Sequence, residues 1–129
     1  MNARAEGDRL AVTAEALYLA NLLLLPGIAF AALVWIYRRR MPGASPLARH
    51  HLRQTVSATI WAGIFLVVAN AVIVVLGGYD QPSTWVVVIV YFTVCHATLV
   101  LLGALGLSRA MAGQRFRFPL IGGLLGREP

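Results

Sequence analysis

The stretch WVVVIVYFTVCHATLVLLGALGL, residues 85–107, contains no Asp, Glu, Lys or Arg. Because a helix rises 1.5 Å per residue, about 20 apolar residues are needed to cross the ~30 Å hydrocarbon core of a bilayer. The stretch meets this length, and so do two other uncharged runs, residues 16–37 and 55–76. We therefore predict an all-α integral membrane protein that crosses the bilayer three times.

The composition of the whole chain also indicates a membrane protein whose surface faces lipid. Of the 129 residues, 59% are hydrophobic and 12% are charged, whereas soluble domains have about 25% charged residues. A chain of this length allows one domain. We expect a single transmembrane domain over residues 1–129, with helices at about 16–37, 46–77 and 85–112 and a tail at 113–129. The single cysteine, Cys95, excludes an intramolecular disulfide and a multi-cysteine metal site.

Turn residues separate the predicted helices. Ser45 is a predicted N-cap and Pro46 a first-turn proline, which start the second helix several residues before the hydrocarbon. Residues 77–82, GGYDQP, form a short turn, so the second and third helices are expected to pack as an antiparallel hairpin. Pro26 and Gly27 interrupt the first run, where we expect a kink that neighbouring helices stabilise.

The charges predict an orientation. All eleven basic residues are arginine. Nine of them lie between the first and second helices or after the third, namely Arg38, Arg39, Arg40, Arg49, Arg53, Arg109, Arg115, Arg117 and Arg127. The other two, Arg4 and Arg9, precede the first helix together with Glu6, Asp8 and Glu15. Since the side richer in Arg and Lys is the cytoplasmic one, we predict a three-helix bundle with its N-terminus outside and its C-terminus inside (N-out/C-in).

A basic patch is expected at the cytoplasmic end of the second helix. It consists of Arg38, Arg39, Arg40, Arg49, His50, His51 and Arg53. Such a patch attracts anionic lipid headgroups, so we expect membrane lipids to be a partner. The alternative is a docking site for an acidic surface of another protein. Because the positive charge flanks apolar runs, as it does in membrane proteins, we do not expect nucleic-acid binding.

The C-terminal tail alternates arginine with aromatic residues before it becomes apolar. The alternating part is Arg115, Phe116, Arg117, Phe118 and Pro119. The tail is too short to cross the bilayer again. We expect it to lie in the cytoplasmic interface or to bind a partner.

One ionisable residue, His96, lies in the middle of the third uncharged run. A charged imidazole at this depth is costly, so His96 is expected to be neutral and hydrogen-bonded. Together with Asn21, Asn70 and Thr93 it is predicted to form an interhelical polar layer that holds the bundle together. The alternative role is a haem or metal ligand. The other two helices offer no second histidine at this depth, so we expect no cofactor and no metal.

Three short motifs carry a resemblance to a known family. They are VWIYRRR at Val34–Arg40, HLRQ at His51–Gln54 and AGQRFRFP at Ala112–Pro119. With the order of the three apolar runs, they resemble a bacterial family of three-helix membrane proteins that is grouped with the Tic-twenty subunit of the chloroplast protein-import machinery. The likeness covers about residues 15–121, although Ser57 and Thr59 stand where family members commonly have Asn and Gln. The resemblance implies the three-helix fold and no catalytic activity.

The sequence predicts a role in a membrane assembly rather than an enzyme. No hydrolase, kinase or redox motif is present, and no acidic residue lies inside any uncharged run. We expect a small accessory subunit that packs laterally against the integral subunits of a larger membrane complex. The alternatives are an oligomeric component of transport or protein translocation and a cofactor-binding membrane anchor that uses His96. Because arginine replaces lysine throughout, which is typical of a GC-rich genome, we expect the bacterial cytoplasmic membrane as its location.

Overall fold

The computed structural model describes residues 3–119 and 121, and this part of the chain is all-helical. The helices are α1 (Ala3–Leu23), α2 (Ile28–Arg40), the short 3₁₀ helix η1 (Met41–Gly43), α3 (Pro46–Val75) and α4 (Pro82–Met111). The prediction of an all-α chain is confirmed. The described residues contain no strand.

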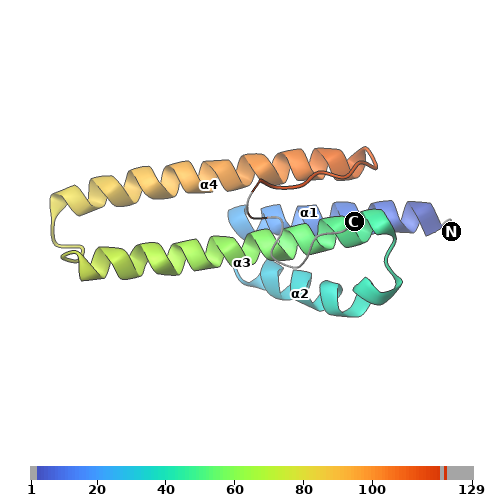
Figure 1. Cartoon of the computed structure of the whole chain (residues 1–129), viewed down its shortest axis with the longest axis horizontal. Coiled ribbons are helices and arrows are strands. Elements are labelled where there is room, and N and C mark those ends of the chain that lie inside the picture. Colours follow the sequence, from blue (N-terminus) through green and yellow to red (C-terminus); the bar gives the residue numbers. More distant parts are fainter. Residues whose placement is uncertain (1–2, 120, 122–129) are drawn as a thin grey trace.

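The helices form two antiparallel hairpins of unequal length (Figure 1). In the long hairpin, α3 and α4 have 30 residues each, or about 45 Å. The short hairpin, α1 and α2, covers only the half of the long hairpin in which α3 begins and α4 ends. In that half α1 packs against both α3 and α4, whereas α3 and α4 make few contacts with each other. The distal half of the long hairpin, toward the α3–α4 turn, is left without a covering helix (Figure 1).

The long helices begin where the sequence indicates. The Ser45 hydroxyl accepts a hydrogen bond from the N–H of Ala48 at 3.2 Å, and Pro46 occupies the first turn of α3. Both helices are long and apolar enough to cross a membrane, and the most apolar 18 residues of each have a mean hydropathy of 2.4 in α3 and 2.3 in α4. In these stretches only 11% and 6% of the residues are buried inside the protein. A core helix of a soluble protein would be mostly buried, so these helices have the surface of lipid-facing ones.

The first uncharged run does not form one helix. Residues 16–37 are divided between α1 and α2, which run in opposite directions (Figure 1). Pro26 has no N–H to donate, and Gly27 adopts a φ of 83° that L residues rarely take. The Asn21 side chain accepts the N–H of Gly27 at 2.8 Å and closes the reversal. The expected kink is therefore a complete turn, and a bundle of three spanning helices is not supported.

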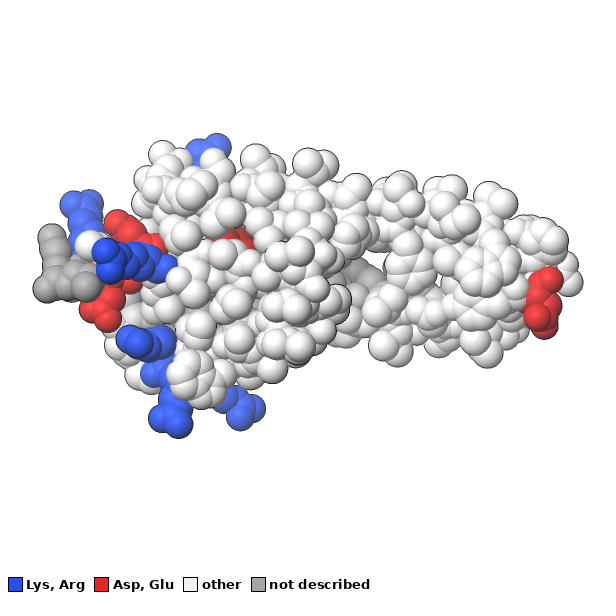
Figure 2. Space-filling view, turned by 180° about the vertical axis from the view of Figure 1, so that it is seen from behind, with Lys and Arg blue, Asp and Glu red and all other residues white. Residues whose placement is uncertain are grey.

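The N-terminal end of α1 lies beside the arginine-rich connection. Arg40 forms an ion pair with Glu6 at 3.6 Å, and a Cβ on Gly7 would be 2.2 Å from the Ser45 hydroxyl oxygen. Figure 2 shows the basic side chains gathered in this half of the molecule, with acidic atoms exposed at the opposite tip, where the α3–α4 turn carries Asp80. The N-out/C-in arrangement is thus not supported, because both ends of the described chain lie in the same half.

Small residues on α4 let α1 approach closely. Gly103, Gly106 and Ala110 are buried. A Cβ at Gly106 would lie 2.5 Å from Oε2 of Glu15, and one at Gly103 would lie 2.6 Å from the Leu19 side chain. These distances are shorter than normal van der Waals contacts, so a larger residue at either position requires side chains of α1 to shift.

We expect Gly106→Ala to lower the thermal stability of the detergent-solubilised protein, because its methyl group overlaps the Glu15 carboxylate. Overpacking of this kind costs about 1–3 kcal/mol. The matched control is Gly63→Ala, since a Cβ at Gly63 meets no atom within 4 Å. Thermal unfolding followed by circular dichroism compares the two variants. Equal midpoints would contradict the close packing of α1 on α4.

Candidate functional site

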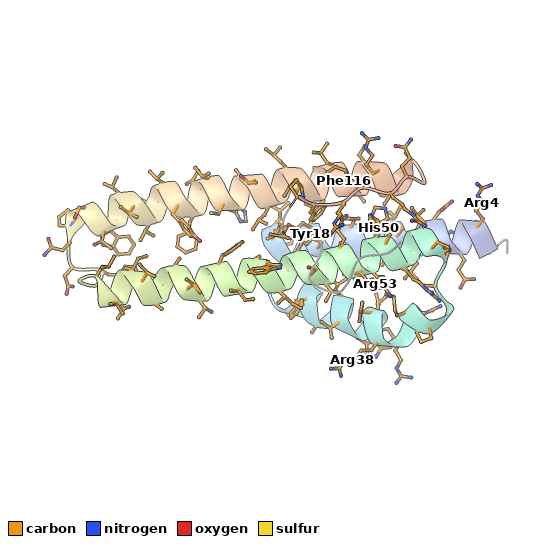
Figure 3. All side chains as sticks on the ribbon, viewed as in Figure 1. Arg4, Tyr18, Arg38, His50, Arg53 and Phe116 are labelled. Carbon is orange, nitrogen blue, oxygen red and sulfur yellow. The ribbon has the colours of Figure 1, made fainter. Side chains whose placement is uncertain are left out.

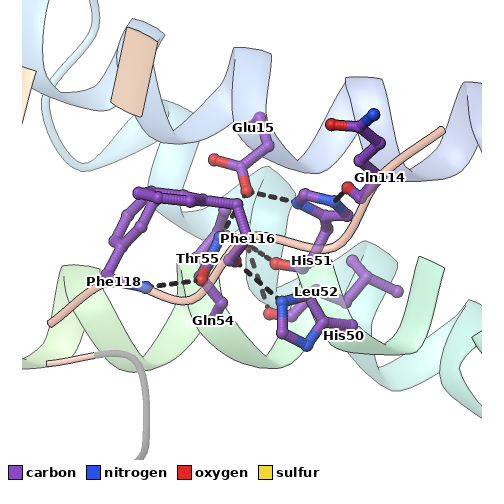
Figure 4. A network of polar contacts seen from close by, with 9 residues as sticks. All are labelled: Glu15, His50, His51, Leu52, Gln54, Thr55, Gln114, Phe116 and Phe118. Carbon is purple, nitrogen blue, oxygen red and sulfur yellow. Dashed lines mark hydrogen bonds and ion pairs between the residues drawn. The ribbon is translucent and has the colours of Figure 1, made fainter. Parts of the chain in front are cut away.

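A cluster of three polar side chains lies completely buried between α1 and α3 (Figure 4). Glu15 comes from α1, and His51 and Gln54 lie one turn apart on α3. Their exposed fractions are 0%, 0% and 1%. One carboxylate oxygen of Glu15 lies 2.6 Å from Nδ1 of His51 and accepts the Gln54 amide at 2.8 Å. We call these three residues the buried cluster.

The hydrogen bonds of the buried cluster fix its net charge. Nε2 of His51 lies 2.9 Å from the carbonyl oxygen of Gln114. A carbonyl can only accept, so Nε2 carries a proton. One further proton is shared between Nδ1 and the Glu15 oxygen across 2.6 Å. The pair therefore has no net charge whichever atom holds that proton, which reduces the cost of burying it.

The second carboxylate oxygen of Glu15 is in a different situation. Oε2 is buried and has no hydrogen-bond partner among the described residues. It faces α4 at Gly106, where a Cβ would lie 2.5 Å away. The close approach of the α4 backbone thus closes the cluster on the side that the α3 side chains leave open.

The segment after α4 crosses the buried cluster as an extended strap (Figure 4). We call residues 114–121 the C-terminal strap; its described residues are 114–119 and 121. Four side chains of α3 bind its main chain. His50 and His51 donate to the carbonyls of Phe116 (2.7 Å) and Gln114 (2.9 Å), Gln54 accepts the N–H of Phe118 (2.8 Å), and Ser57 donates to the carbonyl of Ile121 (2.6 Å).

Aromatic packing completes the attachment of the strap. Phe118 is 1% exposed, and its ring centroid lies 5.3 Å from that of Tyr18 and 5.8 Å from that of Phe116. The Tyr18 hydroxyl donates to the carbonyl of Leu99 on α4 at 3.1 Å. The strap therefore joins α1, α3 and α4.

Some residues of the predicted tail and basic patch are exposed, and others are buried against the helices. In the tail, Arg115 and Arg117 are exposed while Phe118 is buried against the helices. Residues 122–129 lie outside the described part of the chain. In the predicted basic patch, Arg38, Arg39, Arg40 and Arg49 are exposed, Arg53 and His50 are half-buried, and His51 belongs to the buried cluster. Figure 3 places Arg4, Arg38 and Arg53 in the same half of the molecule.

No hydrogen bond joins the four residues of the predicted polar layer in the described part of the chain, although Asn21 and His96 line the same groove. Asn21 bonds to the turn of its own hairpin. Asn70 donates to the carbonyl of Leu66 on its own helix at 2.8 Å and accepts from the Tyr79 hydroxyl. Thr93 and His96 are exposed on α4. An interhelical role for this set stays a prediction that needs a second chain.

Two members of the buried cluster were not recognised from the sequence. Glu15 was counted among the charges that precede the first span, although it is the acid closest to the apolar run. Gln54 was noted only as part of a motif. The available signal was the isolation of Glu15 between Ala14 and Ala16, six residues beyond the nearest other charge, Arg9. In the described residues no group of three or more His, Cys, Asp or Glu could hold a metal ion.

A comparison with protein families matches nearly the whole chain. The model named MamF_MmsF, the magnetosome magnetite crystal formation protein family, matches residues 7–125. This range includes the buried cluster and the C-terminal strap. The resemblance to the Tic-twenty group is wrong, because the matching family is the magnetosome one. No characterised protein and no solved structure shows significant similarity to the chain.

Removing His51 should release the strap. His51→Leu leaves the buried Glu15 carboxylate with the Gln54 amide as its partner in the cluster. The loss of its charge partner should lower the free energy of unfolding by about 3–5 kcal/mol. The substitution also removes the donor to the Gln114 carbonyl. We expect a lower melting temperature and faster tryptic cleavage after Arg115 and Arg117 in detergent.

A second substitution separates these two effects. Adding Glu15→Leu to His51→Leu removes the unpaired charge, so most of the thermal stability should return while cleavage stays fast. Asn70→Leu, whose wild-type hydrogen bonds lie in the distal half, serves as the control and should leave cleavage unchanged. Wild-type cleavage rates in the His51 variants would show that the cluster does not hold the strap.

Proposed function

The chain belongs to the magnetosome magnetite crystal formation protein family, and from this membership we propose that it is a small, non-catalytic accessory protein of the magnetosome membrane that acts in magnetite crystal formation. The observation that carries the proposal is the family match over residues 7–125. The two long apolar helices with unburied surfaces support a membrane location.

In the proposed membrane arrangement, only α3 and α4 cross the bilayer. The short hairpin enters from the arginine-rich side and turns back at residues 24–27, so the described chain begins and ends on one side. The positive-inside rule then places that side in the cytoplasm. The α3–α4 turn, with Asp80, faces the opposite compartment.

The tip of the short hairpin is suited to lipid. Leu23, Leu24, Leu25 and Ile28 are between 51% and 75% exposed. The N–H groups of Leu24 and Leu25 both bond to the carbonyl of Ala20, and Pro26 has none to satisfy. An unpaired backbone N–H is costly in hydrocarbon, and the donors of this turn have partners.

The α3–α4 turn carries too few charged side chains for direct binding of the mineral, which favours an accessory role. Asp80 is the one charged residue between Arg53 and Arg109. A surface that templates an iron mineral would need several oxygen ligands, and a single carboxylate does not provide them. The distal half instead offers lipid-facing apolar helices, so we propose that the protein packs laterally against other integral subunits. The basic patch would bind anionic headgroups of the cytoplasmic leaflet.

Deleting the coding region in a magnetite-forming host should change the size distribution of its crystals, and complementation with the full chain should restore it. Electron microscopy of isolated crystals measures the distribution. Blue-native electrophoresis of the same membranes should show the protein in a species much heavier than its own 14.0 kDa. Unchanged crystals would contradict the role in crystal formation, and a lone small species would contradict the accessory role.

The two-crossing arrangement can be tested by thiol labelling. In a Cys95→Ala background, Arg4→Cys and Asp80→Cys are treated with a membrane-impermeant maleimide in intact cells of a heterologous bacterial host. We expect labelling at position 80 and protection at position 4, with both positions labelled after the cells are permeabilised. Labelling of position 4 in intact cells would contradict the arrangement.

A further inference from the structure

An apolar groove lies between the turn of the short hairpin and the two long helices. Its volume is about 730 Å³. Pro26, Phe30, Leu66, Tyr91 and Leu102 are among its lining residues, and no Asp, Glu, Lys or Arg lines it. The groove exists because α1 ends halfway along the long hairpin and leaves the space beyond its tip unfilled (Figure 1).

The groove has the length of one bilayer leaflet. Its lining runs along α4 from Leu102 to Tyr91, which are eleven residue steps or about 16 Å apart. Half of a ~30 Å hydrocarbon core is about the same distance. The groove is therefore about as long as an acyl chain that extends from the headgroups to the membrane midplane.

The outer end of the groove lies next to positive charge. Pro119 of the C-terminal strap lines it, and the exposed Arg117 is two residues away along the strap. Arg109, seven residues beyond Leu102 on α4, is exposed as well. A molecule that occupies the groove from this side would thus meet a cationic edge at headgroup level.

Most polar side chains in the lining already bond within the protein, and the exposed imidazole of His96 also lines the groove. The hydroxyls of Thr59 and Thr98 donate to carbonyls of their own helices, at 2.7 and 2.8 Å. Asn21 accepts the N–H of Gly27. Apolar cavities of this kind stay free of water and take up apolar molecules. The occupant is therefore mainly apolar.

The volume of the groove, about 730 Å³, is enough for a slender apolar chain that lies along its length.

We propose that this groove is a lipid-binding site that takes one acyl chain of an anionic phospholipid from the arginine-rich leaflet, with the phosphate bound by Arg117 and Arg109. The site rests on the two-crossing membrane arrangement of the proposed function but not on the role in crystal formation. It would anchor the short hairpin in the bilayer by filling the space under its tip.

The test is photo-cross-linking of the full-length protein in nanodiscs. The probe is phosphatidylglycerol with a diazirine in its acyl chain, compared with phosphatidylcholine that carries the same chain. Gly63→Phe fills the groove, because a Cβ there meets no atom within 4 Å; Leu66→Trp is a second filling variant. Val67→Phe, on a 68% exposed side chain outside the lining, is the matched control.

We expect cross-links to lining residues of α3 and α4, reduced about tenfold by either filling variant and unchanged in Val67→Phe. Arg117→Gln should reduce labelling by the anionic probe toward that of the zwitterionic one. His96→Leu should leave labelling unchanged.

Equal labelling of the filling and control variants would overturn the site, and equal labelling by the two lipids in the wild type would overturn the headgroup assignment. Loss of labelling in His96→Leu would replace the acyl chain with a ligand that hydrogen-bonds to the imidazole. Unchanged crystals after gene deletion would overturn the proposed function while leaving the lipid cross-links as they are.

Discussion

The arrangement of the helices depends on the pairing of Glu15 with His51. A carboxylate at the centre of three packed helices is costly unless a partner neutralises it, and here a shared proton leaves the pair without net charge. Because the partners belong to α1 and α3, the pairing fixes how deeply the short hairpin sits on the long one. The other nitrogen of His51 bonds to the strap, so this one side chain links α3 to both α1 and the strap.

The long hairpin could be predicted from the sequence because its determinants are local. The uncharged runs, the Ser45 cap and the GGYDQP turn can each be read from one continuous stretch of sequence. The helix α3 begins at Pro46 as expected. The first run was misinterpreted because its length equals that of a span, although it contains Pro26 and Gly27. The position of Glu15 could not be inferred from local pattern, because its partner lies 36 residues away in the sequence.

The contrast between local and long-range contacts also explains why the buried cluster and the strap were only partly predicted. His50, His51 and the aromatic residues of the strap were all noticed, but as charges and rings that face lipid headgroups. The two histidine rings instead bond to main-chain carbonyls of the strap, which are 63 to 66 residues away in the sequence. Residue type alone does not distinguish an exposed histidine from one that holds an extended segment. The N-out/C-in orientation depended on the same assumption, since counting Arg4 and Arg9 on the opposite side required the first run to cross.

The strap is held at its main-chain atoms by hydrogen bonds from side chains on α3, and this has a consequence for how its sequence can vary. Positions 115 and 117 contribute exposed side chains, so exchange there leaves the four α3 hydrogen bonds in place. Position 118 is constrained twice, because its N–H is bonded to Gln54 and its ring is buried. A proline there would remove the donor. The attachment of the strap to the helices therefore does not depend on the side chains at positions 115 and 117.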